Sequence, residues 1–528
     1  MSCCRSFASS SCRGETILLQ APPGAGKTTR VPLALLGELA NCAPRAGRIW
    51  MIEPRRLAAR AAAERLAASL GEPVGQRVGF AVRGEQRRSA RTQLEVITDG
   101  LFLRRLQADP SLEGVDCVLF DEFHERRRDS DLAFTLLREA APLLQPDLSV
   151  LVMSATLDLT DLQKRLPEAV VLRSEGRAFP VKTFHQPPRR DERLPQQVLR
   201  ALEAHALSLP KGSGVLVFLP GIAEINRCRE LLERTSSLRS WQVNPLHGQL
   251  PLAQQSAALK HCPDSCDGSV VLASAIAESS VTIDGVRLVI DSGLSRQLRF
   301  DPNTGMEGLE TVPSSIASAD QRRGRAGRQG PGQCIRLWSP AEQHRRPSFS
   351  PPELQLADPQ PVLMELAQWG AGLGETLPWL DPPPKAALKE GCGILRDLGI
   401  FNSNNTLTAV GRQLTGLGVH PRLGLLMLEA KRHGRAGLGC DLAAILSERD
   451  PLPISEVGCD LQLRLQAMEH NRRLGPLRER SRQLKQQLAR VALEPINASA
   501  GIDAAELVLC AFPQWLALAR PGKPGRFQ

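Results

Sequence analysis

Short runs of apolar, often β-branched residues alternate with helix-like segments along most of the chain. The runs form two series, with a boundary near residues 175–190. The first series comprises residues 16–20, 48–53, 94–98, 117–120 and 148–154, and the second comprises residues 214–220, 269–274, 286–291 and 334–338. Such runs are typical of strands buried on both faces of a parallel sheet, with helices as the connections between them. The pattern therefore predicts an α/β fold with two tandem parallel-sheet domains.

The composition and the hydrophobic pattern of the sequence change after about residue 345. Proline clusters appear at 345–353 ("RRPSFSPPE") and 380–385 ("LDPPPK"), and the remaining residues read as amphipathic helices. The segment 460–491 is rich in arginine and is expected to be helical over many turns. Its arginines form either a solvated helix face or a surface that faces nucleic acid. The pattern predicts a mainly α-helical region and leaves the role of these arginines open.

Composition limits the class of protein. The 528 residues suggest about three to four domains of roughly 100–200 residues each. No apolar run approaches the ~18 residues that span a bilayer, and the start "MSCCRSFASSSCRGE" lacks the apolar middle of a secretory signal. Thirteen cysteines without such a signal indicate reduced thiols. We therefore expect a soluble, cytoplasmic protein with no membrane partner.

The charge balance points weakly to a polyanionic partner. The chain has 66 Lys and Arg against 56 Asp and Glu, a net charge of +10. Tyrosine is absent and aromatic residues make up only 4%, which favours contacts with a nucleic-acid backbone over base stacking. The sequence "HCPDSC" holds His261, Cys262 and Cys266, but no second Cys/His pair lies at zinc-finger spacing. We expect a polar loop there and no zinc.

A phosphate-binding loop is predicted between the first apolar run and the next helix. Its residues are Gly24, Ala25, Gly26, Lys27, Thr28 and Thr29. The glycines let backbone N–H groups point at phosphates, Lys27 can reach the β- and γ-phosphates, and the Thr28 hydroxyl can ligate Mg²⁺. The first glycine of the usual pattern is Ala21 here. The pattern predicts nucleotide binding.

A second acidic motif, "FDEFHERRRDSD" (120–131), is ambiguous by itself, since it suits a metal site, a catalytic site or a charged loop. The apolar run that precedes Asp121 and Glu122 places both acids at the end of a buried strand. Enzymes with a phosphate-binding loop need one carboxylate to hold Mg²⁺, directly or through water, and a base to orient the attacking water. Asp121 suits the first role and Glu122 the second. Two acids that merely cap a helix are the alternative.

The order of the motifs resembles that of superfamily 2 helicases. The motifs are "GAGKTT" (24–29), "DEFHER" (121–126), "MSAT" (153–156) and "QRRGRAGR" (321–328). His124 in the acidic box matches the DEAH/RHA group. "DEFHER" and "VFLPG" (217–221) look most like the bacterial HrpB type of ATP-dependent helicase. The resemblance covers about residues 15–450 and implies two tandem RecA-like domains.

The resemblance also implies roles for single residues. Arg325 and Arg328 would be arginine fingers that reach the γ-phosphate when the second domain closes on the first. Gln321 would contact the γ-phosphate or the attacking water. The element that couples hydrolysis to domain motion would comprise Ser154, Ala155 and Thr156, together with His124. The implied catalytic residues are Lys27, Asp121, Glu122, His124, Gln321, Arg325 and Arg328.

Further residues match positions that bind nucleic acid or nucleotide in the family. Contacts with the nucleic-acid backbone are implied for Arg55, Arg56, Thr98 and Thr282, and Arg65 lies where related enzymes stack adenine. Residues 296–312 read as a hairpin, which separates strands in the family. A plain surface hairpin is the alternative.

Some features depart from the family or stay ambiguous. The family usually has Thr-Asn at Ser274 and Ala275, and alanine lacks an amide that would bind RNA or couple the domains. Arg126 matches the family box, whereas Arg127 and Arg128 are expected to be solvated charges. The HrpB type continues beyond residue 528, so we expect a naturally short chain or a fragment.

These expectations combine into a domain plan. It divides the chain into an atypical or disordered N-terminus (1–14), a RecA-like ATP-binding domain (15–178), a second RecA-like domain (179–345), a winged-helix-like segment (346–420) and a truncated helical region (421–528).

The function implied is that of an ATP- and Mg²⁺-dependent helicase or translocase. It would act on single-stranded or partly duplex nucleic acid, with RNA favoured over DNA, and move 3′ to 5′. A nucleic-acid-binding scaffold without unwinding is the alternative that Ala275 motivates. A P-loop transporter or signalling NTPase is disfavoured by "QRRGRAGR" in the second domain.

Overall fold

The structure is a computed structural model of the 528-residue chain. It describes residues 14–21, 25–37, 47–154, 159–174, 179–260, 266–278, 283–302, 304–448, 452, 457–493 and 502–517. The described residues divide into two compact units. The α/β unit contains those up to 298 together with 309–353 and 378–381, and the helical unit contains 299–308, 354–377 and those from 382 onward.

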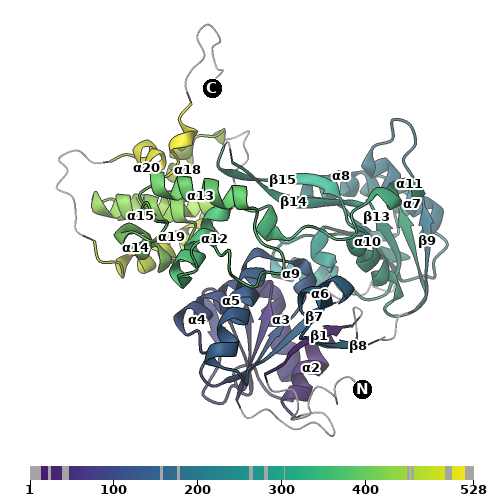
Figure 1. Cartoon of the computed structure of the whole chain (residues 1–528). Coiled ribbons are helices and arrows are strands. Elements are labelled where there is room, and N and C mark those ends of the chain that lie inside the picture. Colours follow the sequence, from purple (N-terminus) through teal and green to yellow (C-terminus); the bar gives the residue numbers. More distant parts are fainter. Residues whose placement is uncertain are drawn as a thin grey trace. The chain divides into compact units, whose positions relative to one another are not determined.

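The first sheet of the α/β unit has eight strands in the order β4-β3-β5-β2-β6-β7-β1-β8 (Figure 1). Its strands are β1 (Thr16–Gln20), β2 (Arg48–Glu53), β3 (Val78–Val82), β4 (Glu85–Arg87), β5 (Leu94–Thr98), β6 (Val115–Phe120), β7 (Ser149–Ser154) and β8 (Val170–Arg173). Every neighbouring pair is parallel except β3 with β4. The carboxyl ends of β1, β2, β5, β6 and β7 therefore share one edge, where open α/β sheets bind their ligands.

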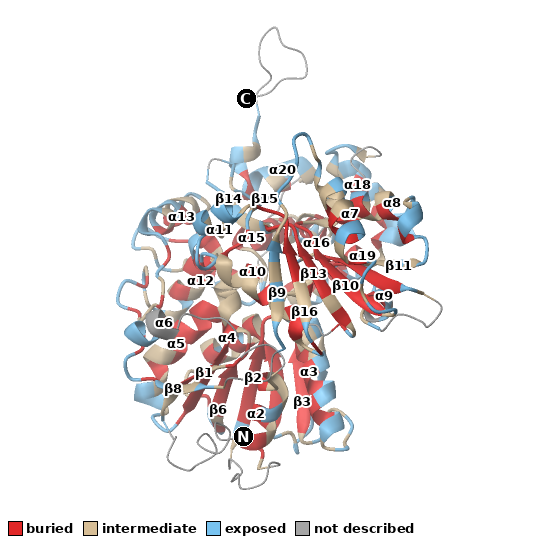
Figure 2. Cartoon of the chain, turned by 90° about the vertical axis from the view of Figure 1, so that its right-hand side faces the viewer, coloured by how far each residue is buried: buried red, intermediate tan, exposed pale blue. Residues whose placement is uncertain are grey.

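Helices pack against both faces of this sheet. They are α2 (Lys27–Leu35), α3 (Arg56–Ser69), α4 (Asp99–Ala108) and α5 (Arg128–Leu144). Because side chains alternate along a strand, Leu119 of β6 joins the core beneath α2 and α3, whereas Phe120 meets Phe102 of α4 and Phe134 of α5 edge-on. The central strands are accordingly buried, as their red colour in Figure 2 shows.

The second sheet has six strands, all parallel, in the order β11-β12-β10-β13-β16-β9. Its strands are β9 (Val181–His185), β10 (Ser213–Phe218), β11 (Trp241–Leu246), β12 (Gly268–Ala273), β13 (Val286–Asp291) and β16 (Gly332–Arg336). Its helices include α7 (Leu194–His205), α8 (Ile222–Glu233), α9 (Leu252–Ala258) and α10 (Ile316–Arg323), with the 3₁₀ turns η4 (Ala275–Ala277) and η5 (Gly324–Gly327). The helices α7 and α8 cover one face, and Ala277 and Ala326 pack on the other.

The helical unit has its own apolar core. Its helices include α12 (Pro359–Trp369), α13 (Lys385–Asp397), α14 (Ala409–Thr415), α15 (Pro421–Arg432), α16 (Ala436–Ser447), α18 (Leu461–His470), α19 (Gly475–Ala489) and α20 (Ala504–Ala511). The buried face of α15 packs against α16 and α20 in this core. Between α13 and α14, Phe401 and Leu407 form an isolated antiparallel bridge. The predicted hairpin is present as β14 (Leu294–Asp301) paired with β15 (Met306–Pro313).

The structure confirms the predicted α/β fold with two parallel sheets and a helical region. The runs at 16–20, 48–53, 94–98 and 286–291 coincide with β1, β2, β5 and β13. Sequence patterns missed β11, which lies at the edge of the second sheet, is mostly only partly buried and contains Pro245. Edge strands tolerate proline and need no continuous apolar run, so β11 lacks the signal that identified the central strands.

The expected long helix at 460–491 is instead interrupted. It consists of α18 and α19, separated by a short 3₁₀ turn at Arg472–Leu474. The Asn471 side chain caps this turn by accepting a hydrogen bond from the Arg473 N–H at 3.0 Å, and Pro476 lies in the first turn of α19. Proline cannot donate the backbone hydrogen bond that a continuous helix needs, so it suits a new helix start.

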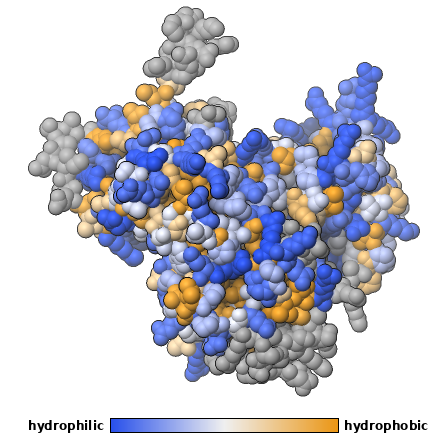
Figure 3. Space-filling model, in the orientation of Figure 1, coloured by the Kyte–Doolittle hydropathy of each residue, from blue (hydrophilic) through white to orange (hydrophobic). Residues whose placement is uncertain are grey.

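Two predicted absences can be examined only in the part of the chain that the structure describes. No helix there is long and apolar enough to cross a bilayer. No group of three or more His, Cys, Asp or Glu in the described ranges is arranged to hold a metal ion. His261 and Cys262 lie outside those ranges. Hydrophilic side chains are spread over much of the face seen in Figure 3.

Phe120 is expected to be a main contributor to the stability of the first sheet. The change Phe120→Ala removes the ring that touches Phe102, Phe123 and Phe134, and should cost about 3–5 kcal/mol. Calorimetry of the full chain would measure this as a lower unfolding temperature. The control Leu143→Ala changes a side chain that is 82% exposed and should cost less than about 0.5 kcal/mol. Equal losses in both variants would contradict the assignment.

Candidate active site

The phosphate-binding loop and the acidic motif meet at the edge of the first sheet. Helix α2 begins at Lys27, directly after Gly26, whose φ of 85° is a left-handed conformation that glycine adopts at little cost. Lys27 is buried at the positive end of this helix. The Thr28 hydroxyl donates a hydrogen bond to Asp121 Oδ2 at 2.5 Å, across 93 positions of sequence. The two predicted Mg²⁺ ligands are therefore adjacent.

The two acids have different environments. Asp121 is 3% exposed, and burial followed by the Glu122 carboxylate raises its pKa, while Lys27 and the Thr28 hydrogen bond oppose the rise. Glu122 has a φ of 49°, which is uncommon for a residue with a side chain. Its N–H donates to Asp121 Oδ1 at 2.8 Å. Among the described residues, its buried Oε2 accepts no hydrogen bond, which leaves that oxygen available to a water molecule.

These side chains fit Mg²⁺. Hydroxyl and carboxylate oxygens are the ligands that this ion prefers, and it is usually held by one or two carboxylates together with substrate phosphates. Thr28 and Asp121 provide such oxygens side by side, and the buried, unbonded oxygen of Glu122 lies in the next residue. The donor set therefore suits a hydrated ion that is shared with a nucleotide.

Glu53 is a further buried acid beside Asp121 that sequence reasoning missed. It ends β2 and is 2% exposed. Burial, and then the carboxylates of Asp121 and Glu122, raise its pKa well above the usual range, and its side chain is hydrogen-bonded to Asp121. The signal was available, because an acid at the end of an apolar run is the same pattern that identified Asp121. Glu53 supports the carboxylate of Asp121 from the neighbouring strand.

His124 connects the acidic motif to the second sheet. Its Nε2 lies 3.0 Å from Nε2 of Gln321 on α10, and its Nδ1 lies 3.4 Å from Glu122 Oε2. Burial, and then the charge of Lys27, lower the pKa of His124 to about 4, so the ring is neutral near pH 7. Because the Gln321 amide donates, Nε2 accepts and the ring proton is assigned to Nδ1. That N–H faces Glu122.

Of the two predicted arginine fingers beside the second sheet, Arg325 is buried and Arg328 is partly buried. Arg325 is 4% exposed, and its Nε donates to the backbone carbonyl of Glu278 at 3.1 Å. Burial, and then the charge of Arg328, lower the pKa of Arg325 to about 9, which leaves it charged at neutral pH. Burial lowers the pKa of Arg328, and the Glu122 carboxylate opposes the change in both arginines. The carboxylate of Glu122, the candidate base, therefore interacts electrostatically with both guanidinium groups.

The residues expected to contact nucleic acid differ in how far they are exposed. Arg55 pairs with Glu125 of the acidic box at 3.1 Å and lines a cavity of about 470 Å³ together with His124 and Gln321. Arg56 is exposed, which suits a backbone contact, whereas Thr98 is buried at the start of α4. The ion pair between Arg55 and Glu125 therefore places a residue of the acidic motif in the wall of this cavity.

Of the remaining predicted site residues, some lie in the part of the chain that the structure describes and others lie outside it. Arg65 is exposed on α3, Thr29 donates to the Gly26 carbonyl at 3.4 Å, and Ser154 is buried at the end of β7. Ala25 is partly buried beside the loop. Outside the described residues lie Gly24, Ala155, Thr156 and Thr282.

Arg127 and Arg128, which were expected to be solvated charges, are partly exposed and are each also paired with an acid. Arg127 pairs with Asp99 at 3.2 Å, and Arg128 pairs with Asp129 at 2.8 Å. Arg126 bonds to Asp131 at 3.0 Å and to Asp381 at 2.8 Å. Asp129 and Asp131 are close in the sequence, whereas Asp381 lies 255 positions from Arg126, so local sequence could not reveal that pair.

Comparison with known proteins agrees with this geometry. Residues 5–164 match the family described as DEAD/DEAH box helicase, and residues 197–330 match the helicase conserved C-terminal domain. The chain is 40% identical to the ATP-dependent RNA helicase HrpB of Escherichia coli over 513 residues, which is 97% of this chain and 60% of HrpB. It is 33% identical to the human probable ATP-dependent RNA helicase DHX34 over 83% of this chain and 38% of that protein.

Solved structures give the same result. A crystal structure of the E. coli DExH-box NTPase HrpB superposes with a TM-score of 0.83 at 39% identity and covers 97% of this chain and 61% of that chain. A second HrpB crystal structure, described as a DEAH/RHA helicase, gives a TM-score of 0.84. The chain thus spans about 60% of the length of HrpB. From its two RecA-like sheets, its motifs and these relatives, we conclude that the chain belongs to the DEAD/DEAH-box helicases and carries the DEAH type of acidic box.

Proposed function

We propose that this chain is an ATP-dependent RNA helicase or translocase that hydrolyses ATP at the edge of the first sheet and moves 3′ to 5′ along one strand. The proposal rests on two groups of residues that lie around Glu122. Lys27, Thr28 and Asp121 come from the first sheet, and the positive charges of Arg325 and Arg328 act on Glu122 from the second. Phosphoryl transfer needs this combination.

In this proposal each side chain has one task. Lys27 binds the β- and γ-phosphates, and Glu122 accepts a hydrogen bond from the attacking water through its unbonded Oε2. Arg325 and Arg328 stabilise the charge that grows on the γ-phosphate oxygens, a contribution of about 10³–10⁵ in rate in GTPases. The burial of Arg325 strengthens this effect, because water screens its guanidinium charge little.

Mg²⁺ would be held by Thr28 and, through water, by Asp121, and would neutralise phosphate charge. Glu53 keeps Asp121 in place from the neighbouring strand through their hydrogen bond. Burial and neighbouring carboxylates raise the pKa of both acids.

Coupling between nucleotide and nucleic acid is proposed to run through His124. Its ring touches Gln321 on one side and faces Glu122 on the other, and it lines the same cavity as Arg55. A shift of either partner therefore changes the environment of the other. We assign Ser154, Ala155 and Thr156 to this coupling element and Arg65 to adenine stacking.

We further propose the domain plan 15–178, 179–345, 346–420 and 421–528 after a separate N-terminal segment (1–14). The winged-helix assignment rests on the order of α13, the Phe401–Leu407 bridge and α14, because a winged helix has a short strand pair next to its helices. RNA is favoured over DNA because the relatives HrpB and DHX34 are named as RNA helicases. Backbone contacts through Arg55, Arg56, Thr98 and Thr282 suit binding without sequence preference.

A nucleic-acid-binding ATPase without unwinding is the second candidate. Ala275 favours it, because this residue lines the cavity of Arg55 and His124 with a methyl group that offers no hydrogen bond. The complete set of buried catalytic charges favours the helicase, since isolated buried charges are costly to keep without a use.

Glu122→Gln is expected to lower the ATP turnover number by at least about 10²-fold, because the amide is a poor proton acceptor for the attacking water. ATP affinity should stay unchanged. Turnover would be measured with poly-RNA, with single-stranded DNA and without polymer, and Glu64→Gln on the exposed face of α3 is the matched control. Wild-type rates in Glu122→Gln would remove its assignment as base. ATP turnover that neither polymer changes would remove the helicase proposal.

Unwinding polarity is tested with two duplexes that differ only in their single-stranded tail. The proposal predicts ATP-dependent displacement of the duplex with a 3′ tail and none of the duplex with a 5′ tail, with Glu122→Gln as the inactive control. The opposite preference would overturn the direction. ATP turnover without displacement of either duplex would establish the second candidate function instead.

The buried His124 predicts a pH effect on stability. Its pKa is about 4 in the folded chain against an ordinary value of 6.5, so the unfolded chain takes up a proton first as pH falls. The wild type should therefore lose stability as pH falls from 6.5 to about 4, and His124→Gln should lose less. Unfolding temperatures across this range would measure the difference. His470→Gln, which alters an exposed ring, should behave like the wild type. Identical pH dependence of all three proteins would contradict the prediction.

A further inference from the structure

One face of the segment that holds the arginine fingers gathers four polar side chains. Ser318, Gln321, Arg322 and Arg325 occupy positions i, i+3, i+4 and i+7 of α10 and η5, and such positions lie above one another on a helix. Gln321 contacts His124. The other three all bind one residue, Glu278, which directly follows the 3₁₀ turn η4 (Ala275–Ala277) after β12.

Glu278 uses both its carboxylate and its backbone. Its Oε2 accepts from Nε of Arg322 at 3.1 Å, and its Oε1 accepts from the Ser318 hydroxyl. Its backbone carbonyl accepts from Nε of Arg325 at 3.1 Å and also from Nη2 of the same guanidinium. One residue therefore bonds to three turns of the finger-bearing face.

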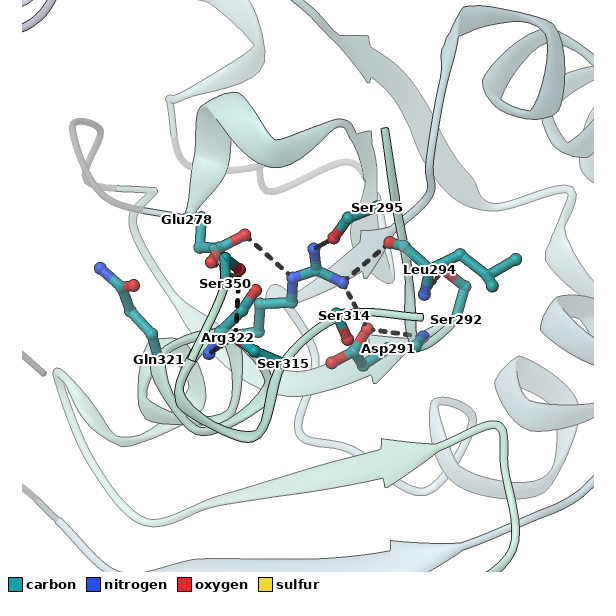
Figure 4. Close-up of polar contacts among 12 residues, drawn as sticks. Glu278, Asp291, Ser292, Leu294, Ser295, Ser314, Ser315, Gln321, Arg322 and Ser350 are labelled. Carbon is teal, nitrogen blue, oxygen red and sulfur yellow. Dashed lines mark hydrogen bonds and ion pairs between the residues drawn. The ribbon is translucent and has the colours of Figure 1, made fainter. Parts of the chain in front are cut away.

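Arg322 fixes the position of Glu278. Figure 4 shows its guanidinium between Glu278 on one side and Asp291 and Leu294 on the other. The side chain is 1% exposed, and Nη1 bonds to Asp291 Oδ1 at 2.9 Å while Nη2 donates to the Ser295 hydroxyl at 2.7 Å. Asp291 is fully buried at the end of β13, so this anchor belongs to the core of the second sheet.

We propose that Glu278 is a positioning residue for ATP hydrolysis, which holds the guanidinium of Arg325 through its backbone carbonyl while Arg322 and Ser318 hold its carboxylate. The inference rests on the proposed function of Arg325. A backbone carbonyl can orient an arginine only if its peptide is held in place, and the buried ion pair of Glu278 with Arg322 provides that restraint. Glu278 itself does not touch the reacting atoms.

Removal of the Glu278 carboxylate should affect catalysis more than folding. Arg322 keeps its buried pair with Asp291, so no charge is left without a partner. Glu278 also lines the cavity shared by His124 and Gln321 and lies only partly exposed there, so its replacement opens no core void. The expected defect is a displaced Arg325, and a displacement of about 1 Å can cost on the order of 10²-fold in rate.

The test is a double-mutant cycle in the full chain, measured as ATP turnover at saturating poly-RNA. Glu278→Ala should lower kcat by about 10- to 100-fold while KM for ATP changes by less than about twofold, because the fingers act in the transition state. In the Arg325→Ala background the same change should lower kcat by less than about twofold, because its target is gone. Glu192→Ala breaks a comparable carboxylate–arginine pair, with Arg200, on the α7 side and should leave kcat unchanged.

The outcomes separate the two proposals. Absence of nucleic-acid-stimulated turnover in the wild type would overturn the proposed function, whatever the variants do. A stimulated wild type with an equal fractional loss in both backgrounds, or with a raised KM alone, would overturn the role of Glu278. If Glu278→Ala fails to fold by circular dichroism, the cycle is repeated with Glu278→Gln. That change keeps an acceptor for Arg322 and lets the Ser318 hydroxyl accept instead of donate, and the same outcomes decide the proposal.

Discussion

Parallel pairing of the strands in the first sheet is the constraint on which the candidate active site depends. Because β1, β2, β6 and β7 run in the same direction, their carboxyl ends lie along one edge. The loop after β1 supplies Lys27 and Thr28, and the turn after β6 supplies Asp121 and Glu122. Residues 93 positions apart thus come within hydrogen-bonding distance. The same edge receives Glu53 from β2, which completes a group of buried acids.

Several charged side chains near the candidate site are buried. Asp121, Glu53, Arg322 and Arg325 are each less than 5% exposed. Charges taken out of water are costly unless each has a partner, so such groups hold one another in fixed geometry. In the second sheet Arg322 is balanced by Asp291 and Glu278. This arrangement fixes the position of the buried Arg325 and limits the screening of its positive charge by water. Such a fixed charge suits the stabilisation of a highly charged transition state.

Much of the fold followed from local patterns. Central strands such as β1, β2 and β13 were predicted to the residue, because strands buried on both faces need continuous apolar runs. The edge strand β11 and the break between α18 and α19 were not predicted, because an edge strand with a proline lacks a continuous apolar run, and the break is marked only by Asn471 and Pro476 within an otherwise helical pattern. The pairing of Arg127 with Asp99 and of Arg126 with Asp381 was also missed. These partners depend on how distant elements pack, and periodicity carries no information about that.

The amino-acid sequence alone specifies the chemistry: a phosphate-binding loop, two acids at a strand end, and an arginine-rich motif in a second α/β domain. Those features are local, because each depends on the spacing of neighbouring residues and on the dihedral freedom of glycine. The partners of the charged groups follow only from the folded chain. Glu53 beside Asp121, His124 against Gln321 and the Glu278 carbonyl on Arg325 arise from strand order and helix packing. Electrostatic interactions act through space at a few ångströms, and residues that far apart in the sequence reach such distances only by folding.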